Sequence, residues 1–331
     1  MLCQSDTSIT KILKVYKKQF SVLKKARGLF LIVLLICLFL IYSRFETPIV
    51  EKKPNAPCGR IYARCSINLA NMMFQYASLY GIAKANNLWP YFECEKTLLY
   101  DTFRLSIPRV TSSPKNATFL SEKACCMHDQ QMMKLGCGKD YVTDGYLQSW
   151  LYFLDYEKEL RKEFTFTSEV SHVCSETFAK IRKELNASSD TVAVGVHVRR
   201  GDLLEPALVN KGYVAANEAF MRVAIFTAQK VLTEPAKRLI IIIVGQEYQW
   251  NMKNVPESPD VYVLSPVSAA VDMCVLSKCN HVIYSVGTYG WWSAFLANGR
   301  TFYMKQFCNP GSEMCRITRA EDHFLPQWKP L

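Results

Sequence analysis

Apolar runs and amphipathic stretches alternate along the second half of the chain. Runs that are apolar at nearly every position lie at 192–198, 239–244, 261–264, 281–284 and 301–304. Segments of helical period lie between them at 215–232 and 268–278, and a further helix is expected to open near Thr288. Continuous apolar strands alternating with helices predict an α/β fold with a doubly wound parallel sheet, covered by helices on both faces.

The first half of the chain is less regular. Apolar residues recur at helical spacing over 67–86, which predicts a helix whose methionine-rich stripe packs in the core. A second helix is expected around 176–185, and no topology is predicted for the rest of 88–190. The folded part is expected to begin near Cys58 and to divide into an N-terminal lobe at 58–190 and a C-terminal lobe at 191–331.

An uncharged apolar segment at 28–42 lies close to the N-terminus. Basic residues flank it, namely Lys24, Lys25 and Arg27 on one side and Arg44 on the other. No small-x-small cleavage site follows, so we expect an uncleaved transmembrane signal anchor at 28–43 rather than a cleaved signal peptide or a buried core helix. The positive-inside rule then places the basic tail, 1–27, in the cytosol. The chain after Arg44 is lumenal in this interpretation and begins with a proline-containing stem at 44–57.

The net charge does not indicate a nucleic-acid-binding protein. Of the formal charge of +11, residues 1–27 account for +6, because they hold seven Lys and Arg against one acid. The remaining +5 forms no continuous basic stripe with interleaved aromatic residues, which single-strand binders require. This balance suits an anionic small ligand instead.

Eleven of the thirteen cysteines lie in the expected lumenal part, since only Cys3 and Cys37 precede it. Disulfides are therefore expected, with at least one thiol left over because the number is odd. The close spacings allow Cys58 to pair with Cys65 and Cys308 with Cys315. No pair has the CxxC spacing typical of zinc or redox sites.

Two sequons for N-glycosylation lie in the same part of the chain. They are Asn116-Ala117-Thr118 and Asn186-Ala187-Ser188. Each is a weak signal alone, but both are consistent with a lumenal location.

Two arginines and a carboxylate directly follow the apolar run at 192–198, which itself contains His197. They are Arg199, Arg200 and Asp202. In an open parallel sheet the ligand lies outside the carboxyl ends of the strands. A guanidinium presents a rigid fork of donors to phosphate oxygens and stabilises charge on a departing phosphate. The pattern predicts a nucleotide diphosphate site, the alternatives being a pair of solvated arginines or, less favoured after a buried strand, an Arg-Gly-Asp adhesion tripeptide.

A second strand end carries Ser285, Gly287 and Thr288. There the chain turns through a glycine into a helix, whose free N–H groups and threonine hydroxyl can hold a phosphate. His281, among apolar neighbours, is interpreted as a core histidine. Trp291 and Trp292 are assigned to packing, with stacking on a sugar as the alternative.

At these residues the chain resembles the alpha-1,2-fucosyltransferase family, which carries an H-x-R-R-x-D motif and a G-T-[FY]-G-x-W motif. Further similar positions are Asn210-Lys211-Gly212, Asp272 and the segment from Phe324 to Trp328. The segment from Ala70 to Ala77 is similar to the family's G-N-Q-M-F-Q-Y-A, but Ala70 replaces its glycine and Met72 its glutamine. The resemblance covers roughly residues 60–331. The altered segment is expected to face the cleft and to influence acceptor choice or turnover.

The resemblance implies a two-lobed GT-B fold and an inverting transfer of fucose from GDP-fucose to a glycan hydroxyl, with galactose O2 as the expected position. Arg199 would hold the departing diphosphate, and Arg200 would support the loop and the charge. His197 and Asp272 would approach guanine or ribose, and Ser285, Gly287 and Thr288 would complete the donor site, with Thr288 on phosphate. Asp202 is the nearest candidate for the general base, or else it orients an arginine. The implied location is the Golgi membrane.

No metal is expected in this reaction. Metal-dependent sugar transferases usually need an acidic pair such as D-x-D, and the only loose match is Glu93-Cys94-Glu95. Two other functions are weighed. One is a catalytically silent, membrane-tethered glycan-binding protein of the same fold, suggested by Ala70 and Met72. The other is a lumenal sulfotransferase, for which the expected Lys-Ser/Gly-rich loop is absent.

Overall fold

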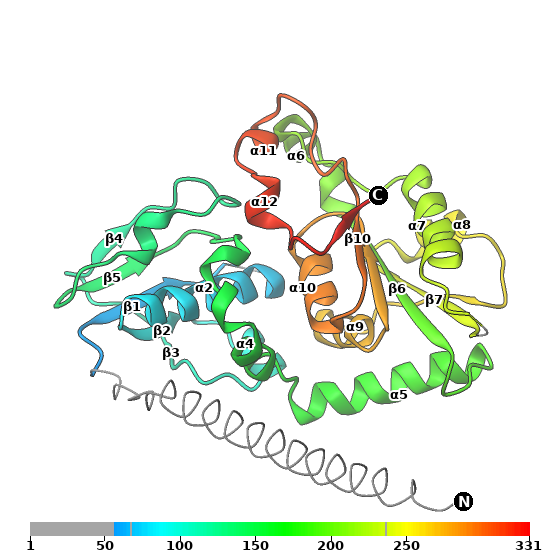
Figure 1. Ribbon diagram of the computed structural model, residues 1–331, viewed down its shortest axis with the longest axis horizontal. Helices are drawn as coiled ribbons and strands as arrows, with labels where there is room; N and C mark the ends of the chain where they lie inside the picture. Colours follow the sequence, from blue (N-terminus) through cyan, green and yellow to red (C-terminus); the bar gives the residue numbers. More distant parts are fainter. Residues whose placement is uncertain (1–55, 67, 236) are drawn as a thin grey trace, which may run out of the picture. The chain divides into compact units, whose positions relative to one another are not determined.

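The computed structural model describes residues 56–331 except 67 and 236, and these residues form one compact unit. The predicted tail, the anchor and all but the last two residues of the stem lie outside the described residues. Within 56–331 no helix is both long and apolar enough to cross a bilayer. The described part contains two parallel β-sheets, which appear on the left and on the right of Figure 1.

The N-terminal sheet is built from residues 60–143. Its order is β3-β2-β1-β5-β4, and all of its strand pairs are parallel. The strands are β1 (Arg60–Arg64), β2 (Trp89–Glu93), β3 (Arg109–Val110), β4 (Thr118–Leu120) and β5 (Asp140–Thr143). β1 is the central strand, since it pairs with β2 on one side and β5 on the other, and its Ile61 is fully buried.

Helix α2 (Leu69–Ala85) packs on this sheet, close to the helix predicted at 67–86. It is apolar on nearly all sides and also contacts α10 (Thr288–Ala297) of the C-terminal sheet, as Figure 1 shows. The ring of Phe74 lies 4.6 Å from that of Trp291 and 5.1 Å from that of Trp292. The two sheets are therefore joined through one aromatic core between α2 and α10.

The C-terminal sheet has the order β11-β10-β9-β6-β7-β8, and its strands are parallel throughout. They are β6 (Val192–Val198), β7 (Leu239–Gly245), β8 (Val261–Val263), β9 (His281–Tyr284), β10 (Thr301–Tyr303) and β11 (Lys329–Pro330). The predicted strands are confirmed to within a residue at each end, and the short β11 adds an edge that the pattern did not show. Every residue of β6 is buried, as its continuous apolar run predicted.

Helices cover both faces of this sheet, which confirms the doubly wound arrangement. Alternate β6 residues such as Val194 pack with α7 (Glu218–Val231) on one face. Ala193 packs on the other face with α5 (Ser168–Glu184) and α9 (Ala269–Ser277). The remaining helices are α3 (Leu98–Thr102), α4 (Glu157–Glu163), α6 (Pro206–Lys211), α8 (Tyr248–Asn254), α11 (Glu313–Arg316) and α12 (Ala320–His323).

Two predicted helix starts were wrong. α7 begins at Glu218 rather than 215, because the Asn217 side chain caps it by accepting the Phe220 N–H at 2.9 Å. α5 begins at Ser168, well before 176. The early turns of α5 are polar, and only Cys174 and Ile181 are buried along its length. The apolar pattern therefore indicated only the C-terminal part of this helix.

Four disulfides link the described cysteines, and one expected pairing was wrong. Cys58 and Cys65 flank β1, so an extended strand separates them. Each instead joins a cysteine next to a neighbouring strand, Cys58 to Cys137 before β5 and Cys65 to Cys94 after β2. The expected Cys308–Cys315 bond is present. Within 56–331 the free thiols are Cys125, Cys126 and Cys279.

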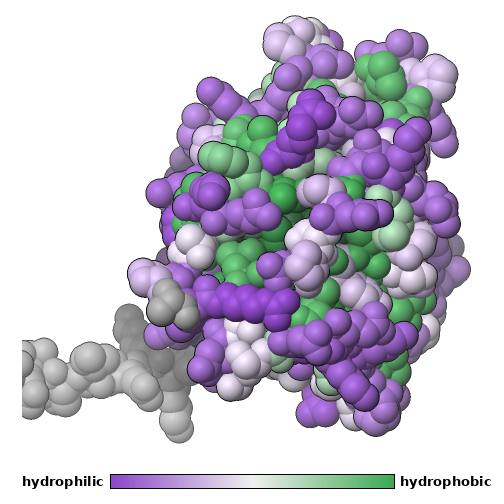
Figure 2. Space-filling view, turned by 90° about the vertical axis from the view of Figure 1, so that its right-hand side faces the viewer, coloured by the Kyte–Doolittle hydropathy of each residue, from purple (hydrophilic) through white to green (hydrophobic). Residues whose placement is uncertain are grey.

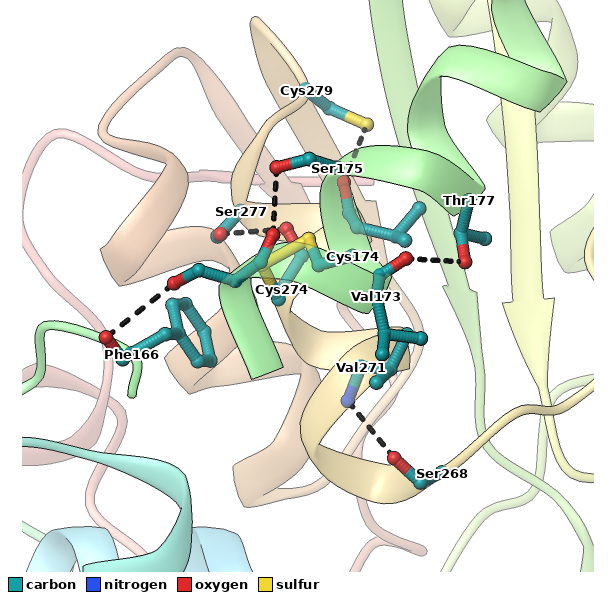
Figure 3. Close-up of a disulfide and its surroundings, with 12 residues drawn as sticks. Phe166, Val173, Cys174, Ser175, Thr177, Ser268, Val271, Cys274, Ser277 and Cys279 are labelled. Atoms are coloured by element: carbon teal, nitrogen blue, oxygen red, sulfur yellow. Dashed lines mark hydrogen bonds between the residues drawn. A yellow bond between two sulfur atoms is a disulfide. The ribbon is translucent and has the colours of Figure 1, made fainter. Parts of the chain in front are cut away.

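The fourth disulfide, Cys174–Cys274, fastens α5 to α9 (Figure 3). It closes the longest loop of the four, with a sequence separation of 100 residues. Hydrogen bonds within α5 and α9 surround the disulfide (Figure 3). One of them caps the start of α9, where the Val271 N–H donates to the Ser268 hydroxyl oxygen. Both cysteines are buried, so the bond is part of the core under the sheet.

The outer surface over α7 and α8 is mixed in character. Figure 2 shows hydrophilic residues interspersed with apolar ones on this side of the molecule. Val223 and Phe226 on α7 and Met252 on α8 are among the exposed apolar side chains.

Candidate active site

The two predicted phosphate-binding segments meet at one edge of the C-terminal sheet. β6 and β9 are neighbours, with His197 opposite Tyr284, so the residues that follow each strand leave the sheet side by side. β7 lies on the other side of β6, with Val198 opposite Gly245, and it brings a third strand end to the same place. This is the carboxyl edge at which parallel sheets bind ligands.

Arg199 is held at this edge by three contacts. Its backbone N–H donates to Ser285 Oγ at 2.8 Å. Its guanidinium donates to Gln246 Oε1 at 2.6 Å and forms an ion pair with Asp202 at 2.5 Å. The side chain keeps 23% of its exposure, so it remains reachable by a ligand. Ser285 is itself buried and acts here as a support for the Arg199 backbone rather than as an open ligand contact.

Arg200 points in a different direction. Its guanidinium is paired with Glu247 at 2.8 Å, lies 4.0 Å from the centroid of the Trp250 ring and also donates to the Ala216 carbonyl oxygen. The Gly201 N–H donates to the same Glu247 carboxylate at 3.0 Å. Arg200 and Trp250 line an open pocket of about 370 Å³ beside the start of α7. These contacts make Arg200 a support of the loop.

The start of α10 lies beside Arg199. Gly287 has a φ of 86°, which favours glycine, and a Cβ placed on it would lie 3.9 Å from Arg199 Cγ. Gly290 allows a second close approach, since a Cβ there would lie 2.8 Å from His197 Nδ1. The first N–H groups of α10 have no acceptor within the helix, and they therefore form an anion-binding end next to the guanidinium.

His197 on β6 and Asp272 on α9 lie near this edge, and Tyr289 of α10 contacts both His197 and the start of α9. The rings of His197 and Tyr289 are 5.0 Å apart, and the Tyr289 hydroxyl donates to the Ala269 carbonyl oxygen at 2.6 Å. Asp272 accepts the Val267 N–H at 3.1 Å, and burial raises its pKa. His197 is 5% exposed, and its Nδ1 has no partner among the described residues. Burial and then the charge of Arg199 lower the pKa of His197 to about 3, so it is a neutral imidazole.

The protein is expected to lose stability below pH 6.5 because of His197. The unfolded chain takes up this proton near pH 6.5 and the folded protein only near pH 3, so between them the unfolded state binds more protons. The free energy of unfolding should then fall by ~1.4 kcal/mol per pH unit from this residue. Glu122, whose pKa burial raises to about 7, acts in the opposite sense, so variants must be compared.

Denaturant unfolding of wild type and His197→Gln at pH 7.5 and pH 5.0 checks this. The wild type should lose about 2 kcal/mol more than the variant between the two pH values. Equal losses would show that His197 titrates normally in the folded protein.

Several residues of this edge were missed from the sequence. Gln246 and Glu247 follow the apolar run at 239–244 with only Gly245 between. Polar residues after an apolar run were the signal that identified Arg199, so the same argument could have found these two. Trp250 follows on α8. Asn71 accepts a hydrogen bond from the Thr288 hydroxyl, and Gln148 donates to the same Asn71 oxygen. Asn71 lies in the segment that resembles the family motif, but no pattern linked it to Thr288, and nothing in the sequence marked Gln148.

Other expected residues lie away from the edge. Trp291 and Trp292 are fully buried, so the stacking alternative is wrong and packing is their role.

His281 is half-buried rather than in the core, and its Nδ1 accepts the Arg300 N–H at 3.1 Å. The Ala70 and Met72 side chains are buried in α2, so they do not face the cleft as expected, and their influence on acceptor choice or turnover stays a prediction.

The loose acidic match lies away from Arg199, and both sequons lie on the surface. Glu93 is paired with Arg64 at 3.3 Å, and Cys94 is in a disulfide, both in the N-terminal sheet rather than beside Arg199. In the described part of the chain no group of three or more His, Cys, Asp or Glu is placed to hold a metal ion. Asn116 and Asn186 are both exposed.

Comparison with known proteins agrees with this arrangement. Residues 23–331 match the family described as Glycosyl transferase family 11. The chain belongs to that family. It is therefore a glycosyltransferase of a fucosyltransferase family, as the motifs predicted.

Similar proteins include galactoside alpha-(1,2)-fucosyltransferase 1 of Oryctolagus cuniculus, 28% identical over 83% of this chain and 74% of the relative. The protein of the same name from Mus musculus is 28% identical over 78% of this chain and 69% of the relative. A solved structure of a mutant of Arabidopsis thaliana FUT1 in complex with GDP superposes with a TM-score of 0.52. It is 12% identical and covers 80% of this chain and 76% of that one, which shows a shared GT-B-like fold.

Proposed function

We propose that this family 11 enzyme transfers L-fucose from GDP-fucose to a glycan hydroxyl, with inversion, and that galactose O2 is the acceptor position. The relatives named above support the linkage, and the GDP in the Arabidopsis structure supports the nucleotide. The observation that carries the proposal is the Arg199 guanidinium, partly exposed beside the anion-binding start of α10. That pair of positive groups fits a nucleotide diphosphate.

The contacts suggest how these residues divide the work. Arg199 binds the diphosphate through its planar fork and stabilises the negative charge that develops as GDP leaves. Asp202 orients that fork, because its carboxylate forms an ion pair with the Arg199 guanidinium at 2.5 Å. Arg200 holds the loop through Glu247. His197, neutral and with Nδ1 unpartnered, and Asp272 are the polar groups available for guanine or ribose.

The test is release of GDP from GDP-fucose in the presence of a panel of glycans. Turnover with acceptors that end in galactose, and linkage analysis showing fucose on O2, is the expected result. The competing function is a silent glycan-binding protein, which would bind members of the panel and release no GDP. Turnover on other sugars alone would replace the galactose assignment and leave the fucosyltransferase assignment intact.

We expect a chelator to leave the rate essentially unchanged. The positive charge facing the diphosphate comes from Arg199 and the start of α10, so no divalent ion is required to neutralise it. The measurement is initial rate with and without excess EDTA. Complete loss of activity, restored by Mn²⁺, would contradict a metal-independent reaction.

We further propose that the protein is a single-pass type II protein of the Golgi membrane, glycosylated at Asn116 and Asn186. The uncharged segment at 28–42 and the two exposed sequons support this. A chain starting near residue 51 behind a cleavable signal should be secreted, with a glycosidase-sensitive mass that Asn116→Gln and Asn186→Gln remove. Retention of that chain in membranes would mean that the segment at 28–42 is not the sole anchor.

A further inference from the structure

Three polar side chains from distant parts of the sequence meet at the starts of two helices. Asn71 is the third residue of α2, and Thr288 is the first residue of α10. The Thr288 hydroxyl donates to Asn71 Oδ1 at 2.8 Å. Gln148 Nε2 donates to the same oxygen at 3.2 Å. Asn71 Oδ1 therefore accepts one hydrogen bond from the side of the N-terminal sheet and one from the side of the C-terminal sheet.

The two sides belong to different sheets. α2 packs on the N-terminal sheet, whereas α10 follows β9 of the C-terminal sheet. Beneath the polar contact the helices share aromatic packing of Phe74 with Trp291 and Trp292. Apolar packing is largely non-directional, so it brings the helices together without fixing the last ångström of their alignment. Directed hydrogen bonds at the helix starts supply that alignment.

Gln148 is a fixed donor rather than a mobile one. Its backbone N–H donates to the Cys125 carbonyl oxygen at 2.8 Å, and its side chain is buried. The residue before it, Leu147, has a φ of 52°, and its N–H donates to the Glu122 carboxylate at 2.6 Å. A residue held in this uncommon conformation by its surroundings indicates that the position of the segment matters.

The Thr288 hydroxyl can donate only one hydrogen bond at a time. A hydroxyl carries one proton, and here the proton is donated to Asn71. A phosphate oxygen also needs a donor, so the hydroxyl cannot serve both. The diphosphate can still be bound by the Arg199 guanidinium and by the N–H groups at the start of α10. The phosphate contact predicted for the Thr288 side chain therefore does not fit this arrangement.

We infer that Asn71, Gln148 and Thr288 form an interlobe clamp that aligns the acceptor side of the enzyme with the donor held at α10. The inference rests on the proposed function. Asn71 and Gln148 are positioning residues in it, since they act through Thr288 rather than on the substrate. A clamp of this kind affects the transfer step, because a displacement of about 1 Å between reacting groups costs on the order of 100-fold in rate. The clamp should not affect the binding of GDP by itself, because in the proposed function GDP binds at the C-terminal sheet.

The experiment is a double-mutant cycle with two readouts. Asn71→Ala, Thr288→Val and the double variant are each measured for GDP affinity by calorimetry and for the rate of fucose transfer at saturating donor. We expect GDP affinity to stay within about 2-fold of wild type and transfer to fall about 10- to 100-fold in each single variant. The double variant should be no slower than the slower single variant, because both remove the same contact.

Matched controls separate the clamp from general damage. Thr288→Ser keeps the hydroxyl and should retain transfer close to wild type. Thr177→Val removes a helix hydroxyl that bonds only within α5, to the Val173 carbonyl oxygen, and should change neither readout. Melting temperatures of all variants identify any loss of folding.

Two results would overturn the inference while leaving the proposed function in place. One is independent effects of Asn71→Ala and Thr288→Val that add in the double variant. The other is a parallel loss of GDP affinity, which would mean that these residues contact the nucleotide directly. If the folded wild type binds no GDP, or no glycan supports transfer, the proposed function itself fails, and the clamp with it.

Discussion

Arg199→Lys is expected to lower fucose transfer about 10- to 150-fold, corresponding to ~1.5–3 kcal/mol of lost stabilisation of the leaving diphosphate. Lysine keeps the positive charge but replaces the planar fork by a single mobile ammonium group. The structure makes geometry decisive, because Arg199 is aligned by both Gln246 and Asp202. The measurement is kcat and KM for GDP-fucose on purified, folded enzyme. Arg199→Ala should cost more than Arg199→Lys.

A surface arginine provides the matched control. Arg222→Lys, on the outer face of α7, makes the same chemical change at a side chain that is 71% exposed, and should leave turnover unchanged. Melting temperatures are needed because Arg199 also holds its loop through Asp202, so a slow variant could be a poorly folded one. Near-normal turnover by both Arg199→Lys and Arg199→Ala would remove this residue from the donor site and the diphosphate assignment with it.

The C-terminal half of the fold was predictable because its signals are local. Strands buried on both faces are apolar at successive positions, so the bounds of β6 and β9 followed from the pattern alone. The N-terminal sheet lacks this signal. β3 and β4 have two and three residues, and β2 begins with an exposed Trp89 and then a proline. Short strands that are partly exposed do not produce a period that can be recognised.

The candidate site divides in the same way. Arg199 could be identified because it directly follows β6, and Gly287 because it lies in the short turn after β9; parallel neighbours bring such strand ends together. The residues that bond to this strand-end group could not all be identified from strand ends. Thr288 bonds to a residue 217 positions away, and only the packing of α2 on α10 creates that contact. The expected placement of the Ala70 and Met72 side chains was wrong for a related reason, since a helical period does not show which side of a wholly buried helix meets another lobe.

Replacing both Cys174 and Cys274 by alanine is expected to give the largest loss of stability among the disulfides. The bond closes 100 residues, for which the chain-entropy relation gives about 4.7 kcal/mol. α5 depends on it in particular, because only Cys174 and Ile181 are buried along that helix. For a protein of this size each kcal/mol shifts the melting temperature by about 2–4 °C, so a fall of roughly 10–18 °C is expected. Changing both cysteines avoids leaving a thiol that could pair wrongly.

The comparison that isolates loop length is Cys308→Ala with Cys315→Ala. That bond spans 7 residues, and the same relation gives about 2.4 kcal/mol, half the effect. Thermal unfolding without reductant measures both double variants against wild type. Because Cys174 and Cys274 lie under the sheet and not at its carboxyl edge, GDP affinity well below the melting temperature should survive their loss. Equal melting shifts for the two pairs would contradict this account, since the stabilisation would then come from local packing rather than from restriction of the unfolded chain.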